Sequence, residues 1–199
     1  MSETAEKSTA KPLPSNASSR SLYVTKKHLK EFILSRMLNL EIINLGFSEN
    51  GQLDYEIAEL MEKCDASLYI LDFMPNVSVA QIHEKTEKFY RILRDKQPDT
   101  PIMFIEEPIF PHTKYDLNIQ SKVHQLNRAL HEVFDNLKAK GERNIFLIPS
   151  TGMIETNSEA TVDGIHFTDL GFMRYARYLY PKIQKNNRKS AIIFNICPS

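Results

Sequence analysis

The chain lacks three features that would narrow its class at once: a net charge, a long apolar run and a cysteine framework. Its 25 basic and 25 acidic side chains cancel, so the total charge predicts no attraction to nucleic acid or to an anionic membrane. No apolar run approaches the roughly 18 residues of a membrane-spanning helix. The two cysteines, Cys64 and Cys197, are too few for a disulfide framework and lack metal-site spacing. We therefore expect no membrane span, no nucleic-acid partner, no metal and no cofactor.

The start of the chain also lacks the apolar core of a signal peptide, which makes the cytoplasm the default compartment. If a targeting segment has been lost, a secreted or periplasmic location stays open. Residues 1–20 are rich in Ser, Ala, Lys and Pro and contain one leucine, a composition that predicts a flexible tail. Glycine is scarce as well, and the first of the six glycines is Gly46.

Short apolar runs alternate with amphipathic helical patterns through the rest of the chain. Each run has the length of a strand and is almost continuously apolar, as in a sheet that is covered on both faces. The alternation predicts an α/β domain over residues 21–185, with a mainly parallel sheet between two layers of helices. The strand candidates are residues 41–45, 67–72, 101–106 and 144–149. The helix candidates are residues 25–38, 53–63, 79–96, 122–140 (ended by Gly141) and 169–185.

The C-terminal tail, residues 186–199, contains one more strand-like run at 192–196. Its simplest interpretation is an edge strand or an unordered end. A second interpretation, developed below, gives this run a place inside the sheet.

The most informative stretch begins at Asp163 and places a carboxylate three residues before His166. At this spacing a turn can bring the carboxylate to the imidazole, fix its tautomer and stabilise its charged form, as a general base requires. A histidine that is merely part of the local structure is the competing interpretation. A base with an orienting partner implies a nucleophile elsewhere in the chain.

Two further loops follow strand candidates, where open α/β sheets build their sites. Gly46 follows the first strand candidate and could turn its backbone N–H toward a ligand, although a plain turn explains it as well. Asn76 follows Pro75 and could donate its amide to an oxyanion. Alternatively, Asp72 or Asn76 caps the next helix. His112 lies in a loop, where it would line the mouth of a pocket or face solvent; His131 is most simply a surface residue.

Together these blocks resemble the SGNH (GDSL-type) hydrolases, particularly a bacterial branch, over residues 34–183. The resemblance implies a flavodoxin-like three-layer α/β/α sandwich that hydrolyses a small ester, such as an acetylated carbohydrate, without a cofactor. It also implies that His166 is the base, Asp163 its orienter, and Gly46 and Asn76 the oxyanion hole. The matching blocks are Gly46-Phe47-Ser48-x-Asn50-Gly51, Asp72-x-x-Pro75-Asn76 and Asp163-Gly164-x-His166-x-Thr168-Asp169-Leu170-Gly171-Phe172.

The family's nucleophile block, a Gly-x-Ser directly after the first strand, is missing. Ser15, Ser18 and Ser19 fall near the expected offset, but the residues around them include no glycine and no apolar strand. Ser48 belongs to the second block and more simply supports that loop. The nucleophile therefore stays unknown, and so do the substrate and the oligomeric state. The resemblance equally allows a catalytically inactive or truncated relative, acting as a binding module or without function. A third option is a histidine base that activates water directly.

The loss of the first strand also has a structural consequence. In this fold that strand lies centrally, between the runs at 41–45 and 67–72. Removing it would leave two unpaired strand edges about 9–10 Å apart. We expect one of two segments, 22–24 or 192–196, to pair into the gap.

Overall fold

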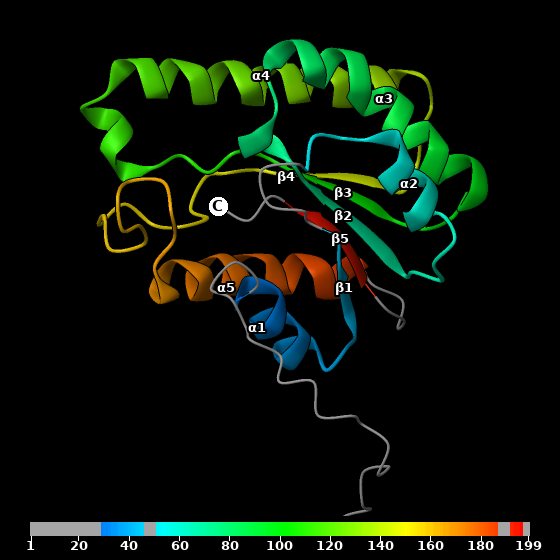
Figure 1. Ribbon diagram of the computed structural model, residues 1–199, viewed down its shortest axis with the longest axis horizontal. Coiled ribbons are helices and arrows are strands. Elements are labelled where there is room, and N and C mark those ends of the chain that lie inside the picture. Colours follow the sequence, from blue (N-terminus) through cyan, green and yellow to red (C-terminus); the bar gives the residue numbers. More distant parts are fainter. Residues whose placement is uncertain (1–28, 46–50, 187–191, 197–199) are drawn as a thin grey trace, which may run out of the picture.

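The computed structural model describes residues 29–45, 51–186 and 192–196, which form a three-layer α/β/α sandwich (Figure 1). The middle layer is a five-stranded sheet in which every pair of neighbouring strands is parallel. The predicted fold class is therefore confirmed. The strands are β1 (Ile42–Asn44), β2 (Leu68–Asp72), β3 (Ile102–Ile105), β4 (Ile145–Ile148) and β5 (Ile192–Ile196).

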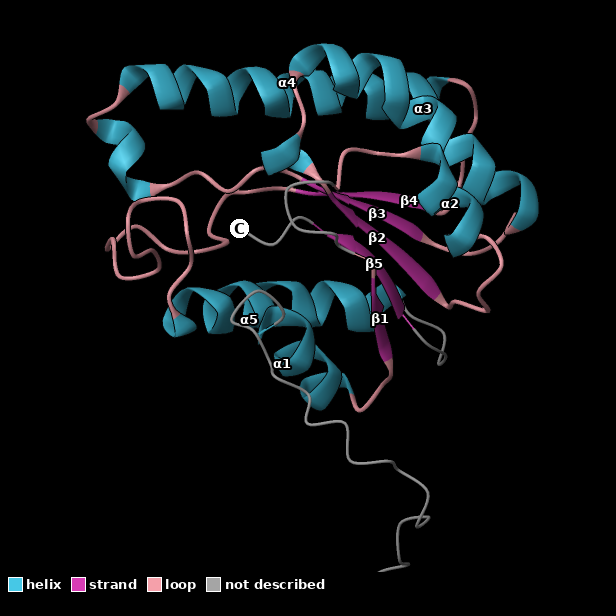
Figure 2. Cartoon of the chain, viewed as in Figure 1, coloured by secondary structure: helices cyan, strands magenta, loops and turns pink. Residues whose placement is uncertain are grey.

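Helices cover both faces of the sheet, as Figure 2 shows. On one face lie α2 (Tyr55–Met61), α3 (Val79–Lys96) and α4 (Leu117–Ala139). On the other lie α1 (Leu29–Leu38) and α5 (Asp169–Asn186). Two short 3-10 helices, η3 (Met74–Asn76) and η4 (Pro111–Lys114), follow the carboxyl ends of β2 and β3.

The sheet separates two apolar cores, and successive residues of a strand enter them alternately. In β2, Leu68 and Ile70 belong to the core on the α1/α5 side. Tyr69 and Leu71 belong to the core under α2, α3 and α4. Because both faces are buried, every residue of β2 and β3 is shielded from solvent. This burial explains why the runs are almost continuously apolar.

The C-terminal strand β5 lies inside the sheet, whose strand order is β1-β5-β2-β3-β4 (Figure 1). Its first residue, Ile192, is opposite Ile42 of β1 and Leu68 of β2, and its last, Ile196, is opposite Asp72. The interpretation of this run as an edge strand or an unordered end was wrong. The alternative, that residues 192–196 fill the gap between the first two strand candidates, is confirmed. The other candidate, 22–24, lies outside the described residues.

One suggested helix cap and one predicted helix start differ from the structure, whereas α3 has the predicted bounds, 79–96. Helix α3 is capped by Ser78, whose hydroxyl accepts from the backbone N–H of Gln81 while the Gln81 side chain accepts from the Ser78 N–H. The alternative interpretation, in which Asp72 or Asn76 caps this helix, was therefore wrong. Helix α4 starts at Leu117 rather than 122, because Asp116 caps it.

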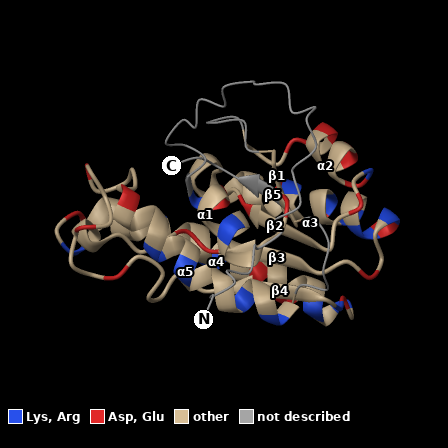
Figure 3. Ribbon diagram, turned by 90° about the horizontal axis from the view of Figure 1, so that it is seen from below, with Lys and Arg blue, Asp and Glu red and all other residues tan. Residues whose placement is uncertain are grey.

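The predicted glycine at the end of α4 and the balance of basic and acidic residues are both visible in the structure. Gly141 follows α4 with φ +86°, a conformation that glycine adopts without strain. Lys, Arg, Asp and Glu residues of both signs are distributed over the helices and loops in Figure 3. Among the described helices, none is long and apolar enough to cross a membrane.

Candidate active site

The Asp163–His166 turn is closed by three hydrogen bonds onto one carboxylate. Oδ2 of Asp163 lies 2.6 Å from Nδ1 of His166. Oδ1 accepts from the backbone N–H groups of His166 (2.8 Å) and Ile165 (3.0 Å). The hydrogen bond from the His166 backbone N–H and, next in size, the bond to the His166 ring hold the pKa of the Asp163 carboxyl well below its usual range. An ionised carboxylate only accepts hydrogen bonds, so Nδ1 carries the proton and Nε2 is the basic atom.

A short antiparallel bridge fixes this turn to the start of α5. Thr161 pairs with Phe167, and the Val162 N–H donates to the carbonyl of His166 (2.8 Å). The Thr168 hydroxyl accepts from the Gly171 N–H in the first turn of the helix. A Cβ on Gly171 would lie 2.0 Å from the Ala160 carbonyl oxygen, so only glycine permits this approach. These contacts explain why the block that begins at Asp163 has threonine at position 168 and glycine at position 171.

His112 packs directly against the same turn, which the sequence did not predict. Gly164 has φ +96°, and a Cβ there would lie 2.8 Å from Nδ1 of His112. The His112 ring also stacks at 5.8 Å from Phe110, in a tilted arrangement. His112 is therefore half-buried rather than free in solvent, and it supports the turn that carries His166.

The end of β2 carries a buried charge cluster. Asp72 accepts from Lys30 of α1 (2.9 Å) and from the Tyr175 hydroxyl of α5 (2.7 Å), and all three side chains are buried. These bonds tie the strand to the two helices beneath the sheet. Asn76 then closes η3 with a backbone bond from its N–H to the Phe73 carbonyl (3.1 Å).

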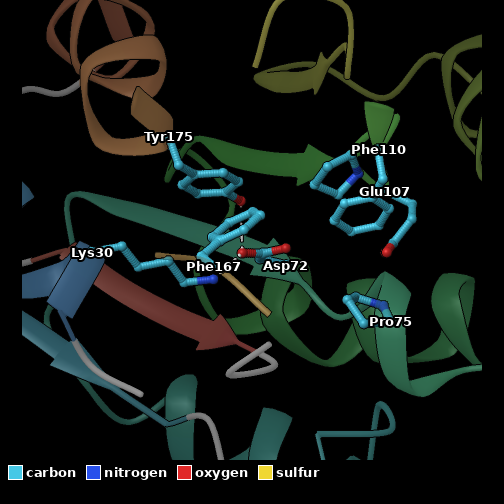
Figure 4. A pocket seen from close by; sticks show the side chains of 8 residues that line it. Lys30, Asp72, Pro75, Glu107, Phe110, Phe167 and Tyr175 are labelled. Carbon is cyan, nitrogen blue, oxygen red and sulfur yellow. Dashed lines mark hydrogen bonds and ion pairs between the residues drawn. The ribbon is translucent and has the colours of Figure 1, made fainter. Parts of the chain in front are cut away.

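A narrow pocket lies where these segments meet (Figure 4). The loop after β2 contributes Asp72 and Pro75, and the stretch after β3 contributes Glu107, Pro108 and Phe110. The remaining walls are Lys30, Phe167 and Tyr175. Pro75 precedes Asn76 and Phe167 follows His166 in the chain, so the structure brings these two predicted loops to one pocket. Gly46 and Ser48, and also Ser15, Ser18 and Ser19, lie outside the described residues.

Ser150, which follows β4, is a serine whose contacts show whether it could act as a nucleophile. Its hydroxyl donates to Oε2 of Glu106 (2.7 Å), and its N–H donates to the same oxygen (2.8 Å). His131 contacts the other oxygen, Oε1. The Ser150 hydroxyl therefore donates its hydrogen bond to a carboxylate and not to an imidazole. These bonds hold the loop after β4 in place. His131, read from the sequence as a plain surface residue, takes part in this bracing.

Sequence reasoning missed Lys30, Glu106 and Glu107 as members of this region. The pair Glu106-Glu107 at the carboxyl end of a strand candidate was a usable signal, because charged residues rarely end a buried strand without a partner or a role. Lys30 carried no signal, since its partner Asp72 lies 42 positions away. Within the described residues, no group of three or more His, Cys, Asp and Glu side chains could hold a metal ion.

Solved structures that resemble this fold include the following two. A candidate GDSL-like lipase from Bacteroides ovatus is 36% identical with a TM-score of 0.68, over 74% of this chain and 44% of that chain. The salicylyl-acyltransferase SsfX3 from a tetracycline biosynthetic pathway is 19% identical with a TM-score of 0.64, over 77% of this chain and 47% of its own. This chain thus spans less than half the length of either protein.

No curated protein matches the chain. The model of the GDSL-like lipase/acylhydrolase family matches residues 29–184, which contain the Asp163–His166 turn, the loop after β2 and all but the last strand. The chain therefore belongs to the GDSL-like lipase/acylhydrolase family.

Proposed function

We propose that this chain hydrolyses small esters, with His166 as the general base and Asp163 as its orienting partner. The observation that carries the proposal is the 2.6 Å contact between Asp163 Oδ2 and His166 Nδ1. The next residue, Phe167, lines a pocket at the carboxyl end of the parallel sheet. Membership of an acylhydrolase family supports this reaction class. The exposed Nε2 edge of His166 is open to a substrate or a nucleophile.

The proposed reaction follows from these positions. A nucleophile O–H, or water, attacks the acyl carbon and passes its proton to Nε2 of His166. Asp163 stabilises the imidazolium that forms. The carbonyl oxygen becomes an oxyanion, which the Asn76 amide and the Gly46 N–H are proposed to hold. The tetrahedral intermediate then collapses, and the imidazolium passes the proton to the leaving alcohol. When water is the nucleophile, this step releases the acid. When a hydroxyl of the chain attacks, it leaves an acyl-enzyme ester, which a water molecule then cleaves with the same base to release the acid and restore the hydroxyl.

The nucleophile is the open part of this proposal. Among the described residues no hydroxyl is hydrogen-bonded to the His166 ring, which contacts the Asp163 carboxylate. The slot of the family's first strand is filled by β5, and the residues after β5 are Cys197, Pro198 and Ser199. These residues lie outside the described part. They join Ser48 as positions that an experiment must map.

Labelling of the full chain tests the proposal. A fluorophosphonate followed by peptide mass mapping identifies an activated serine, and a chloroacetamide probe reports Cys197. We expect His166→Ala and Asp163→Asn to slow labelling about a hundredfold or more, because general-base catalysis is worth that much. His124→Ala is the matched control, since His124 is exposed on α4.

The outcomes separate the remaining alternatives. A folded protein that neither labels nor releases acid from p-nitrophenyl acetate supports the catalytically inactive relative, a binding module without chemistry. Acid release that depends on His166 but gives no covalent label points to water activated directly by the histidine. Labelling that is indifferent to His166 contradicts the proposed base.

A further inference from the structure

Glu107 is a buried carboxyl that the proposed reaction does not use. Its side chain is 5% exposed, and Oε2 has no hydrogen-bond partner among the described residues. A buried polar atom without a partner costs about 1–3 kcal/mol, so such an atom in a native site calls for an explanation. Glu107 is one of the residues that line the pocket described above.

The backbone of Glu107 is held rigidly, which commits its side chain to the pocket. The Asn127 amide of α4 accepts from the Glu107 N–H (2.8 Å) and donates to the Glu107 carbonyl (3.0 Å). Both bonds are buried. Figure 4 shows the carboxyl on the side of the pocket where Asp72 and Pro75 lie. Two hydrogen bonds at one residue fix the direction of its Cα–Cβ bond, as a binding residue needs.

The charges around the pocket favour an uncharged ligand. Lys30, a buried cation in its wall, is bonded to Asp72 at 2.9 Å, so the two formal charges cancel. Burial, reinforced by the negative charge of Asp72, raises the pKa of Glu107 to about 8, against the opposing effect of Lys122 on α4 and of Lys30. Near pH 7 the carboxyl is therefore mostly a neutral acid, with one O–H donor and one C=O acceptor. With the Lys30–Asp72 pair balanced and Glu107 neutral, the wall has no net charge to attract an ionised ligand, and a hydroxyl can enter as a neutral partner.

The size of the pocket points in the same direction. Its remaining walls are the rings of Pro75, Pro108, Phe110, Phe167 and Tyr175. The free space between them accommodates about one water-sized group. A hydroxyl fits this space, whereas an acyl chain does not.

We propose that Glu107 is a specificity-determining residue that binds a hydroxyl group of the substrate's alcohol, so that the site prefers esters of polyols to esters of plain alcohols. The inference rests on the proposed function, because the pocket is lined by Pro75 and Phe167, the chain neighbours of Asn76 and His166. The carboxyl O–H donates to the substrate hydroxyl oxygen, and the carboxyl C=O accepts the substrate hydroxyl proton.

A matched pair of esters tests the preference. Glycerol monoacetate and propyl acetate share the acyl group and the three-carbon alcohol, and they differ in two hydroxyls. We expect the wild type to have a kcat/KM about tenfold or more higher for glycerol monoacetate, since a site built for a hydrogen bond discriminates against a ligand that lacks it. Glu107→Leu removes the preference, so that its kcat/KM for glycerol monoacetate falls to about that for propyl acetate. Glu59→Gln, on the exposed side of α2, is the control and changes neither.

Glu107→Gln separates hydrogen bonding from charge. The amide keeps a donor and an acceptor but does not ionise. We expect it to retain the preference at every pH. In the wild type the carboxyl loses its O–H donor as pH rises through about 8 and keeps only acceptors, so the preference should change with pH in the wild type and not in Glu107→Gln. A Glu107→Leu variant that keeps the preference, or that loses both esters equally, overturns the proposal.

Binding measured without turnover keeps this proposal distinct from the proposed function. Saturation-transfer NMR detects contact of either ester with the protein, whether or not it is hydrolysed. A signal from glycerol monoacetate that is lost in Glu107→Leu supports the pocket even if no ester is cleaved. Equal signals from both esters, or none from either, mean that the carboxyl binds only a buried water, which overturns the proposal.

Discussion

We expect the stability of the sheet to depend on β5, and a substitution of Ile193 in this strand tests that dependence. Its side chain is 0% exposed and belongs to the core under α2, α3 and α4. It lies opposite Ile43 of β1 and Tyr69 of β2. Truncation of a buried isoleucine to alanine costs about 2–5 kcal/mol, because the lost transfer energy adds to that of the cavity. Domains of this size have a total stability of about 5–15 kcal/mol, so we expect Ile193→Ala to remove a large part of it.

Urea unfolding measures this loss. Far-UV circular dichroism is the suitable signal, because the chain contains no tryptophan. Ile193→Val gives a graded variant that stays folded, with an expected cost of about 0.5–1.5 kcal/mol. Val162→Ala is the matched control, since Val162 is 76% exposed and should change stability by less than about 0.5 kcal/mol.

Hydrogen exchange provides an independent check on the same argument. The amides of a central strand exchange only through large openings, whereas an unpaired tail exchanges at the rate of a free peptide. We expect residues 192–196 to be among the most protected. Unprotected amides in this segment, together with an Ile193→Ala midpoint equal to that of the wild type, would refute the placement of β5 inside the sheet.

Three further predictions concern stability. Gly171→Ala should unfold the start of α5 and lower the thermal midpoint sharply, because its Cβ would lie 2.0 Å from the Ala160 carbonyl oxygen; a midpoint within a degree of the wild type would contradict this. Arg94→Met should cost about 2–4 kcal/mol in urea, since the guanidinium donates to several carbonyls of two loops, including those of Pro98 and Thr100. Glu31 is buried and burial raises its pKa to about 7, so the native state holds a proton that the unfolded state has already released. Stability should therefore fall as pH rises from about 4.5 to 7, and Glu31→Gln should remove up to about 3 kcal/mol of that fall at pH 8; parallel pH profiles of the two proteins would rule this out.

The layers of the fold were predictable because they depend on local patterns. Apolar runs of strand length alternate with helical periodicity, and each pattern needs only neighbouring residues. Helix α4 shows the limit of this approach. Its first turn, from Leu117, carries few apolar positions that repeat, and the signal that was overlooked is the cap at Asp116. The place of β5 came from a different argument, the need to fill a gap between two strands, and not from the sequence of residues 192–196 itself.

The candidate site was predictable only where its partners are close in sequence. Asp163 and His166 are three residues apart, and their contact follows from one turn of chain. Lys30, Asp72 and Tyr175 come together from three distant segments, and no spacing rule connects them. The proposed role of Glu107 likewise could not be predicted, because the residues that form the pocket around its carboxyl come together only in the folded chain.

The position of β5 constrains how this protein folds during synthesis. A ribosome makes the chain from the N-terminus, so β1, β2, β3 and β4 all emerge before the strand that separates the first two. Until residues 192–196 leave the exit tunnel, the facing edges of β1 and β2 have no permanent partner and can recruit strands from other chains. We therefore expect chaperones to matter most for this protein in the interval before residues 192–196 become available to pair with β1 and β2.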